Sequence, residues 1–174
     1  LKVLIFNSMK KILFLAASML LTIAAFAETM PANDSRVTYV GRTMVEGTDV
    51  SFDWTATYFR IEFSGKSLTM RASETKWDVD ADKAATRHNY YNVWIDSPTS
   101  AEPHRIIEVA GNDTIIELID PACLKKSRRA VHEVIVQKRT EGEQGKTTIH
   151  EFATDPTGKF FQAKGLNERQ LEFI

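Results

Sequence analysis

Apolar and polar residues alternate along most of this chain, and that period of two constrains its fold more than any other feature. Phe59, Ile61 and Phe63 alternate with more polar neighbours, and a turn follows at Gly65. The stretch from Leu68 to Ala72 then repeats the pattern. Successive side chains of a strand point to opposite faces, so this alternation predicts half-buried β-strands. No stretch of about 12 residues keeps the apolar stripe that a helix requires.

The same period predicts strands along the rest of the chain, separated by Gly-, Asn- and Pro-containing turns. These strands are expected around Tyr91–Ile95 and over Arg36–Gly41, Val50–Trp54, Arg105–Val109, Thr114–Ile119, Val131–Arg139, Thr147–Ala153 and Leu171–Ile174. About ten short strands with this spacing indicate an all-β fold, a jelly-roll-like antiparallel β-sandwich. We expect Ser73–Asn89 to form the one long polar loop and Glu28–Ser35 to be a short tether.

The first 27 residues have the pattern of an export signal. Met9-Lys10-Lys11 precedes an apolar run from Ile12 to Ala25, and Ala25-Phe26-Ala27 provides the small residues of a cleavage site. The run is about 14 residues long, which is short for a membrane span, although a membrane anchor is the alternative. We expect residues 1–27 to be upstream residues plus a signal peptide cleaved after Ala27. A secreted or periplasmic single domain, residues 28–174, would remain, without a membrane contact.

Charge and cysteine content exclude several classes of function. Lys and Arg number 22 against 23 Asp and Glu, so no basic surface for nucleic acid is expected. The single cysteine, Cys123, excludes a disulfide framework and a multi-cysteine zinc site. We expect Cys123 to be a small buried or half-buried residue.

Several motifs begin like catalytic or metal-binding sequences but are incomplete. His132-Glu133 starts like a zinc-protease motif, but Val136 occupies the position of the second histidine. The acidic repeat Asp78–Asp82 starts like a calcium loop, but Lys83 replaces the required glycine. No Gly-x-Ser-x-Gly or phosphate-binding loop is present. We therefore expect no catalytic residue, metal site or cofactor in this chain.

The tryptophans are the candidate ligand-binding residues. A flat indole ring suits the apolar face of a sugar ring. Trp77 lies in the expected long loop, and Trp94 points away from the apolar face of its strand, so these two are the predicted carbohydrate contacts. Trp54 is a weaker candidate, and packing in the core is the alternative for all three.

A resemblance to a known family is found in the order of the strand motifs. The motifs are, in sequence, Val40-Gly41-Arg42, Phe52-Asp53-Trp54, Phe59–Leu68, Tyr91–Asp96, His132-Glu133-Val134, Lys138–Glu141 and Leu171–Ile174. Together they resemble the N-terminal β-sandwich of carbohydrate esterase family 2, from about Val37 to Ile174. Those proteins are secreted bacterial esterases in which an SGNH/GDSL hydrolase domain follows the sandwich.

The resemblance implies a role in removing acetyl groups from plant polysaccharide such as acetylated xylan. The family nucleophile lies in a Gly-Asp-Ser turn directly after a strand similar to Leu171–Ile174, and this sequence ends at Ile174. We therefore expect a gene fragment that is inactive alone and whose partner is the missing C-terminal hydrolase domain. The alternative is a free-standing, non-catalytic module that binds carbohydrate or is purely structural. Exposed tryptophans beside polar groups would favour binding, and buried ones the structural role.

Overall fold

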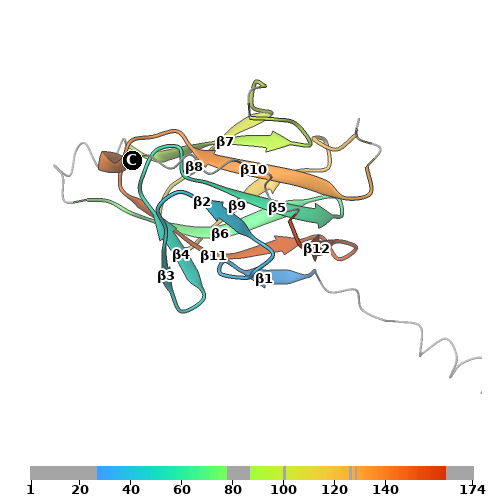
Figure 1. Ribbon diagram of the computed structural model, residues 1–174, viewed down its shortest axis with the longest axis horizontal. Coiled ribbons are helices and arrows are strands. Elements are labelled where there is room, and N and C mark those ends of the chain that lie inside the picture. The colour runs from blue at the N-terminus through green and yellow to red at the C-terminus, as the bar shows by residue number, and fades with distance from the viewer. Residues whose placement is uncertain (1–26, 78–86, 100, 126, 128, 164–174) are drawn as a thin grey trace, which may run out of the picture.

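Two antiparallel sheets pack face to face in the computed structural model, which describes residues 27–77, 87–99, 101–125, 127 and 129–163 (Figure 1). The first sheet has the order β3 (Met44–Glu46), β4 (Asp49–Phe52), β11 (Lys146–Thr154), β6 (Leu68–Thr75) and β9 (Thr114–Ile119), and β1 (Thr29–Pro31) also pairs with β11. The second has the order β12 (Lys159–Phe161), β5 (Tyr58–Ser64), β10 (His132–Lys138), β7 (Asn89–Ile95) and β8 (Arg105–Val109), and β2 (Thr38–Val40) also pairs with β5. These strands confirm the predicted all-β sandwich.

The predicted alternation sets the two inner faces. Phe59 and Phe63 of β5 are 0% exposed and Ile61 is 1% exposed. The register of β5 with β10 places Val136 opposite Phe59 and Val134 opposite Ile61, so both strands face the core with apolar side chains. Across the core, the Phe59 ring lies 5.3 Å from that of Phe152 on β11, centroid to centroid. Large aromatic side chains therefore join the two sheets by apolar burial.

The segment Glu28–Ser35 is part of the sandwich, so the prediction of a tether was wrong. Met30 of β1 is fully buried, and β1 pairs with β11. The Thr154 amide donates to the Glu28 carbonyl at 3.0 Å. Three residues are too few to show a period of two, so this strand could not be predicted from alternation.

Two other short strands, β3 and β12, were also not predicted. All three residues of β3 are exposed, so the strand has no alternation to detect. The expected long loop is shorter than predicted, because β6 continues to Thr75 and β7 starts at Asn89. Three expected segments lie outside the described residues. They are the Asp78–Asp82 repeat, the Leu171–Ile174 strand and the signal peptide, apart from its last residue, Ala27.

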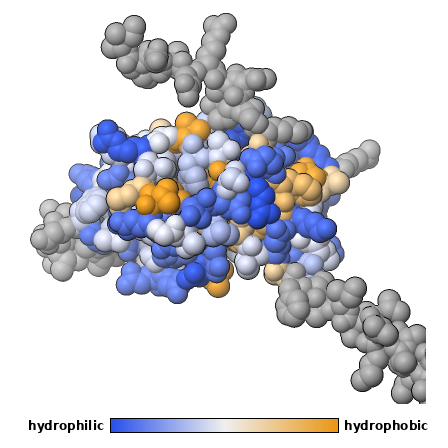
Figure 2. All heavy atoms as spheres, turned by 60° about the horizontal axis from the view of Figure 1, so that its bottom comes forward, coloured by the Kyte–Doolittle hydropathy of each residue, from blue (hydrophilic) through white to orange (hydrophobic). Residues whose placement is uncertain are grey.

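The surface seen in Figure 2 is largely hydrophilic, with apolar patches among polar residues. No helix among the described residues is long and apolar enough to cross a membrane. The helical structure in this part of the chain is one 3-10 turn, η1 (Gly142–Gln144), between β10 and β11. That turn lies at one end of the sandwich, where the candidate site is found (Figure 1).

Candidate functional site

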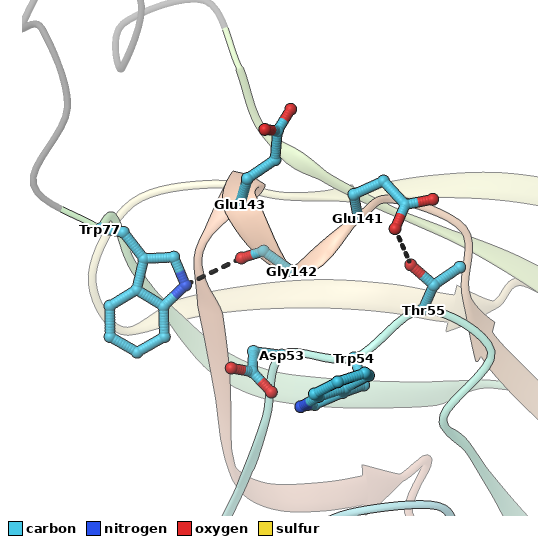
Figure 3. A pocket seen from close by; sticks show the side chains of 7 residues that line it. All are labelled: Asp53, Trp54, Thr55, Trp77, Glu141, Gly142 and Glu143. Carbon is cyan, nitrogen blue, oxygen red and sulfur yellow. Dashed lines mark hydrogen bonds between the residues drawn. The ribbon is translucent and has the colours of Figure 1, made fainter.

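Three connections meet at this end of the sandwich and surround a pocket of about 400 Å³. They are the residues after β4, the residues after β6, and the turn η1. The pocket is lined by Asp53, Trp54, Thr55, Trp77, Glu141, Gly142 and Glu143, and we call it the Trp54–Trp77 pocket (Figure 3). Its volume lies in the range of small-ligand sites.

Both tryptophans of the pocket are exposed yet held in place. The indole Nε1 of Trp77 donates to the Gly142 carbonyl at 2.8 Å, and Trp77 is 42% exposed. The Arg42 guanidinium lies 4.7 Å from the centre of the Trp54 ring, and Trp54 is 56% exposed. Asp53 stands between the two indoles (Figure 3). Contacts at the edge of Trp77 and on the ring of Trp54 therefore fix two aromatic groups that remain open to solvent.

A close backbone approach brings η1 against the end of β6. Gly145, directly after η1, has φ +113°, a conformation that favours glycine. A Cβ added there would lie only 2.5 Å from the Thr75 carbonyl oxygen. Glycine at this position therefore lets η1 lie beside the segment that carries Trp77.

A buried lysine supports the turn from below. Lys138 is 1% exposed, and its Nζ donates to the carbonyls of Thr140 at 2.9 Å and Glu141 at 3.1 Å. Burial lowers the pKa of Lys138 to about 8, although the nearby carboxylates of Asp53, Glu141 and Glu74 oppose this shift. The lysine thus fixes the chain that leads into η1.

A polar network continues from this lysine to the other sheet. Thr140 Oγ1 donates to Asn89 Oδ1 at 3.2 Å, and Asn89 donates through its backbone and side-chain amides to Glu74 at 2.9 and 2.8 Å. Burial would raise the pKa of Glu74, but hydrogen bonds from His88, Lys76 and Asn89 hold it below its ordinary value. Residues of β6, β7 and β10 are therefore linked directly beneath the pocket.

Two smaller pockets adjoin the first. One of about 290 Å³ shares Trp54 and Thr55 with it, and another of about 190 Å³ shares Asp53 and Trp77. Arg42 lines both smaller pockets. Each of the three hollows is therefore bordered by Trp54, by Trp77 or by both.

The structure separates the two predicted carbohydrate contacts. Trp77 lines the pocket, whereas Trp94 on β7 is 3% exposed and donates from Nε1 to the Ala101 carbonyl at 2.8 Å. No open ring face of Trp94 is available to a sugar in this structure. Trp54, the weaker candidate, lies beside Trp77 instead. Its place at the end of the expected strand Val50–Trp54 was the available signal, because strand ends lie at the ends of a sandwich.

A second group of polar residues crosses the outer face of the first sheet. Ser73 on β6, His150 on β11 and Asp49 on β4 are joined by hydrogen bonds through both ring nitrogens of the histidine. The sequence could not reveal this group, because its members are far apart in the chain and meet only through strand pairing. We call it the Ser73–His150–Asp49 relay.

Two other predictions about chemistry can be compared with the structure. Cys123 is half-buried, as predicted. His132 lies on strand β10, so the helical face of a zinc protease does not form there. Within the described ranges, no group of three or more His, Cys, Asp and Glu side chains could hold a metal ion.

Comparisons with known structures agree with this architecture. An esterase of family two from Cellvibrio japonicus aligns with a TM-score of 0.64 and 19% identity, over 83% of this chain and 37% of that one. A family two carbohydrate esterase from Clostridium thermocellum, in complex with cellohexaose, aligns with a TM-score of 0.57 and 16% identity, over 74% and 34%. An acetyl xylan esterase from Butyrivibrio proteoclasticus aligns with a TM-score of 0.59 and 11% identity, over 80% of this chain and 34% of that one. At these identities the likeness shows a shared fold.

This chain spans about a third of the length of those solved esterases. No curated protein sequence matches it. Residues 39–163, more than two thirds of the chain, match the family described as "Carbohydrate esterase 2 N-terminal". The chain therefore belongs to the carbohydrate esterase 2 N-terminal family.

Proposed function

We propose that this chain is the accessory N-terminal domain of a secreted carbohydrate esterase that removes acetyl groups from plant polysaccharide such as acetylated xylan. The observation that carries the proposal is the family match over residues 39–163. In this proposal the domain positions or completes a neighbouring hydrolase domain and has no esterase activity alone.

The proposed partner is a C-terminal SGNH hydrolase domain. The solved esterases with the same fold are about three times as long as the matching region, which leaves room in them for such a domain. The catalytic Gly-Asp-Ser turn and the distal histidine would come from that domain.

Substrate and location are further parts of the proposal. One neighbour is described as an acetyl xylan esterase and another as a complex with cellohexaose, which supports a plant polysaccharide as the substrate. Export is supported by the signal-peptide pattern from Met9 to Ala27. Amino-terminal sequencing of the exported protein would test it, with Glu28 expected as the first residue.

The central test is to sequence the DNA beyond the codon for Ile174 and assay its product. A continuing frame with Gly-Asp-Ser and a distal histidine is expected. The full product should release acetate from acetylated xylan, and this chain alone should not. A stop codon there, with no hydrolase frame downstream, would refute the accessory role.

A free-standing carbohydrate-binding module is the second candidate. The exposed Trp54 and Trp77 beside carboxylates favour it over a purely structural sandwich. This candidate predicts the stop codon and saturable binding to polysaccharide.

A further inference from the structure

The Trp54–Trp77 pocket combines open aromatic rings with hydrogen-bond acceptors. Trp54 and Trp77 are 56% and 42% exposed, whereas most of the large apolar side chains of the sandwich are buried. Exposed tryptophans that share a concave site are typical of binding surfaces, because the indole buries much apolar area with few rotamers. Such rings match ligands that have a flat apolar face.

The rest of the lining is polar and acidic. Asp53, Glu141 and Glu143 contribute three carboxylates, and none of the lining side chains that the structure describes is basic. Arg87 Nη1 lies 3.6 Å from Glu143 Oε1 and offsets part of this negative charge, and the Arg42 guanidinium lies 4.7 Å from the centre of the Trp54 ring. Carboxylates accept hydrogen bonds and donate none, so they suit a ligand rich in hydroxyl donors. They also repel an anionic ligand. A neutral sugar has both required properties, a C–H face and many hydroxyl groups.

Hydrogen bonds hold the lining groups of the pocket in place. Trp77 is bonded to Gly142, and Thr55 Oγ1 lies 3.0 Å from both the Thr140 carbonyl and Glu141 Oε2. Lys138 holds the same turn from beneath. Rigid lining groups reduce the entropy lost on binding.

The three neighbouring hollows together offer more room than one sugar ring fills. The pocket of about 400 Å³ shares Trp54 with the pocket of about 290 Å³ and Trp77 with the pocket of about 190 Å³. The basic side chains Arg42 and Lys146 line only the smaller pockets. A chain of several sugars could therefore follow the hollows, with its neutral section at the acidic centre.

We propose that the Trp54–Trp77 pocket binds a neutral oligosaccharide and discriminates against chains that carry uronic acids at its centre. This inference rests on the proposed function, since the pocket would hold the polysaccharide near an esterase domain. It does not depend on the presence of that domain, because every group involved lies on this chain.

Calorimetric titration of the purified chain would test the proposal. The probes are xylohexaose and cellohexaose as neutral chains and hexagalacturonate as the anionic one. Saturable binding of at least one neutral hexasaccharide is expected, with weaker binding of hexagalacturonate. Trp77→Ala and Trp54→Ala should each weaken neutral binding by about tenfold, from lost aromatic contact.

Matched variants control for folding and charge. Phe161→Ala, at an exposed aromatic on β12, should bind as the unchanged chain does. Trp77→Phe should bind more tightly than Trp77→Ala, because it keeps a flat ring. Glu143→Gln keeps a hydrogen-bonding group but removes a charge, so it should improve hexagalacturonate binding relative to xylohexaose. Circular dichroism should confirm that each variant is folded.

The outcomes separate this proposal from the proposed function. No saturable binding of either neutral chain, or unchanged binding in both alanine variants, would overturn the inference, even if the full gene product deacetylates xylan. Tighter binding of hexagalacturonate than of both neutral chains would also overturn it. Neutral binding with the expected losses would support it, even if no hydrolase frame follows Ile174.

Discussion

The Ser73 hydroxyl oxygen lies 2.8 Å from His150 Nε2 on the outer face of the first sheet. His150 Nδ1 in turn lies 2.9 Å from Asp49 Oδ2. Hydroxyl, imidazole and carboxylate thus follow one another as in a serine hydrolase. The surroundings differ, however, because Ser73 lies within strand β6 and accepts the Asp113 amide at 2.9 Å. A nucleophile also requires an oxyanion hole, and none of the three pockets described above includes Ser73 in its lining.

The first prediction is that the relay stabilises the sheet and does not hydrolyse esters. Ser73→Ala removes the contact to His150 and the acceptor for Asp113, so it should lower the free energy of unfolding by about 1 kcal/mol. Urea denaturation measures this change. Hydrolysis of 4-nitrophenyl acetate by the purified chain should be the same before and after the substitution. A rate that Ser73→Ala abolishes would show that the relay is catalytic.

The second prediction concerns the pH dependence that Lys138 introduces. Burial lowers its pKa from 10.5 to about 8, so between these values the unfolded chain binds a proton that the folded chain does not. The folded state is therefore penalised below about pH 8, and the penalty is relieved as pH rises toward 10.5. Relative to Lys138→Met, the unchanged chain should gain about 1 kcal/mol per pH unit across this window.

Urea denaturation of both proteins at several pH values would measure the difference in their unfolding free energies. The titrating groups that the two proteins share cancel in this difference. A difference that stays flat across the window would contradict the lowered pKa. Lys138→Met should also loosen the turn that precedes η1, because the Thr140 and Glu141 carbonyls lose their donor.

The third prediction concerns Asp155, which joins two turns at the other end of the sandwich. Its carboxylate accepts the backbone amides of Lys66, Ser67 and Thr157 and the Thr157 hydroxyl. Burial would raise the pKa of Asp155, but these hydrogen bonds outweigh it and lower the pKa to about 2. Because the folded pKa is depressed, the stabilisation is present above about pH 4 and is lost as pH falls through about 2.

Asp155→Asn keeps the shape of the side chain but removes the charge. It should cost about 1 kcal/mol of unfolding free energy at neutral pH, because the partly solvated carboxylate contributes less than its full pKa shift would give. That difference should shrink as the pH falls from about 4 to about 2, which denaturant titrations in acid would measure. A difference that does not depend on pH in this range would show that the charge of Asp155 makes no net contribution.

The sequence predicted the long strands because their pattern is determined by burial. Phe59, Ile61 and Phe63 had to share one face, and all are at most 1% exposed. It missed β1 and β3 for different reasons. Met30 is buried, but β1 has only three residues, whereas β3 is exposed along its whole length. Pairing with β11 and β4 creates these strands, and pairing cannot be read from a local pattern.

The candidate site was only partly predictable, for a related reason. Trp77 could be identified as an aromatic residue in a polar stretch. Trp94 alternates away from the core residues of β7, yet it is 3% exposed because the outer face of that strand is covered at this point. Alternation distinguishes the two faces of a strand but does not show whether the outer face is covered. Likewise, Asp53 and Glu143 line the same pocket only because η1 lies against the end of β6.

The last prediction tests the packing between the sheets through Phe59. This residue is fully buried, and its ring lies 5.3 Å from that of Phe152 and 5.9 Å from that of Tyr39, centroid to centroid. Phe59→Ala would leave a cavity between β5 and β11, so it should lower the free energy of unfolding by about 3–5 kcal/mol. Ile115→Ala is the matched control, because Ile115 lies on strand β9 but is 70% exposed.

The control should change stability by no more than about 0.5 kcal/mol. Thermal or urea unfolding of the three proteins gives both values. Equal losses in the two variants would contradict the assignment of Phe59 to the core and of Ile115 to the surface. A large loss at Phe59 alone would support the inward facing that the alternation in the sequence predicts for this side chain.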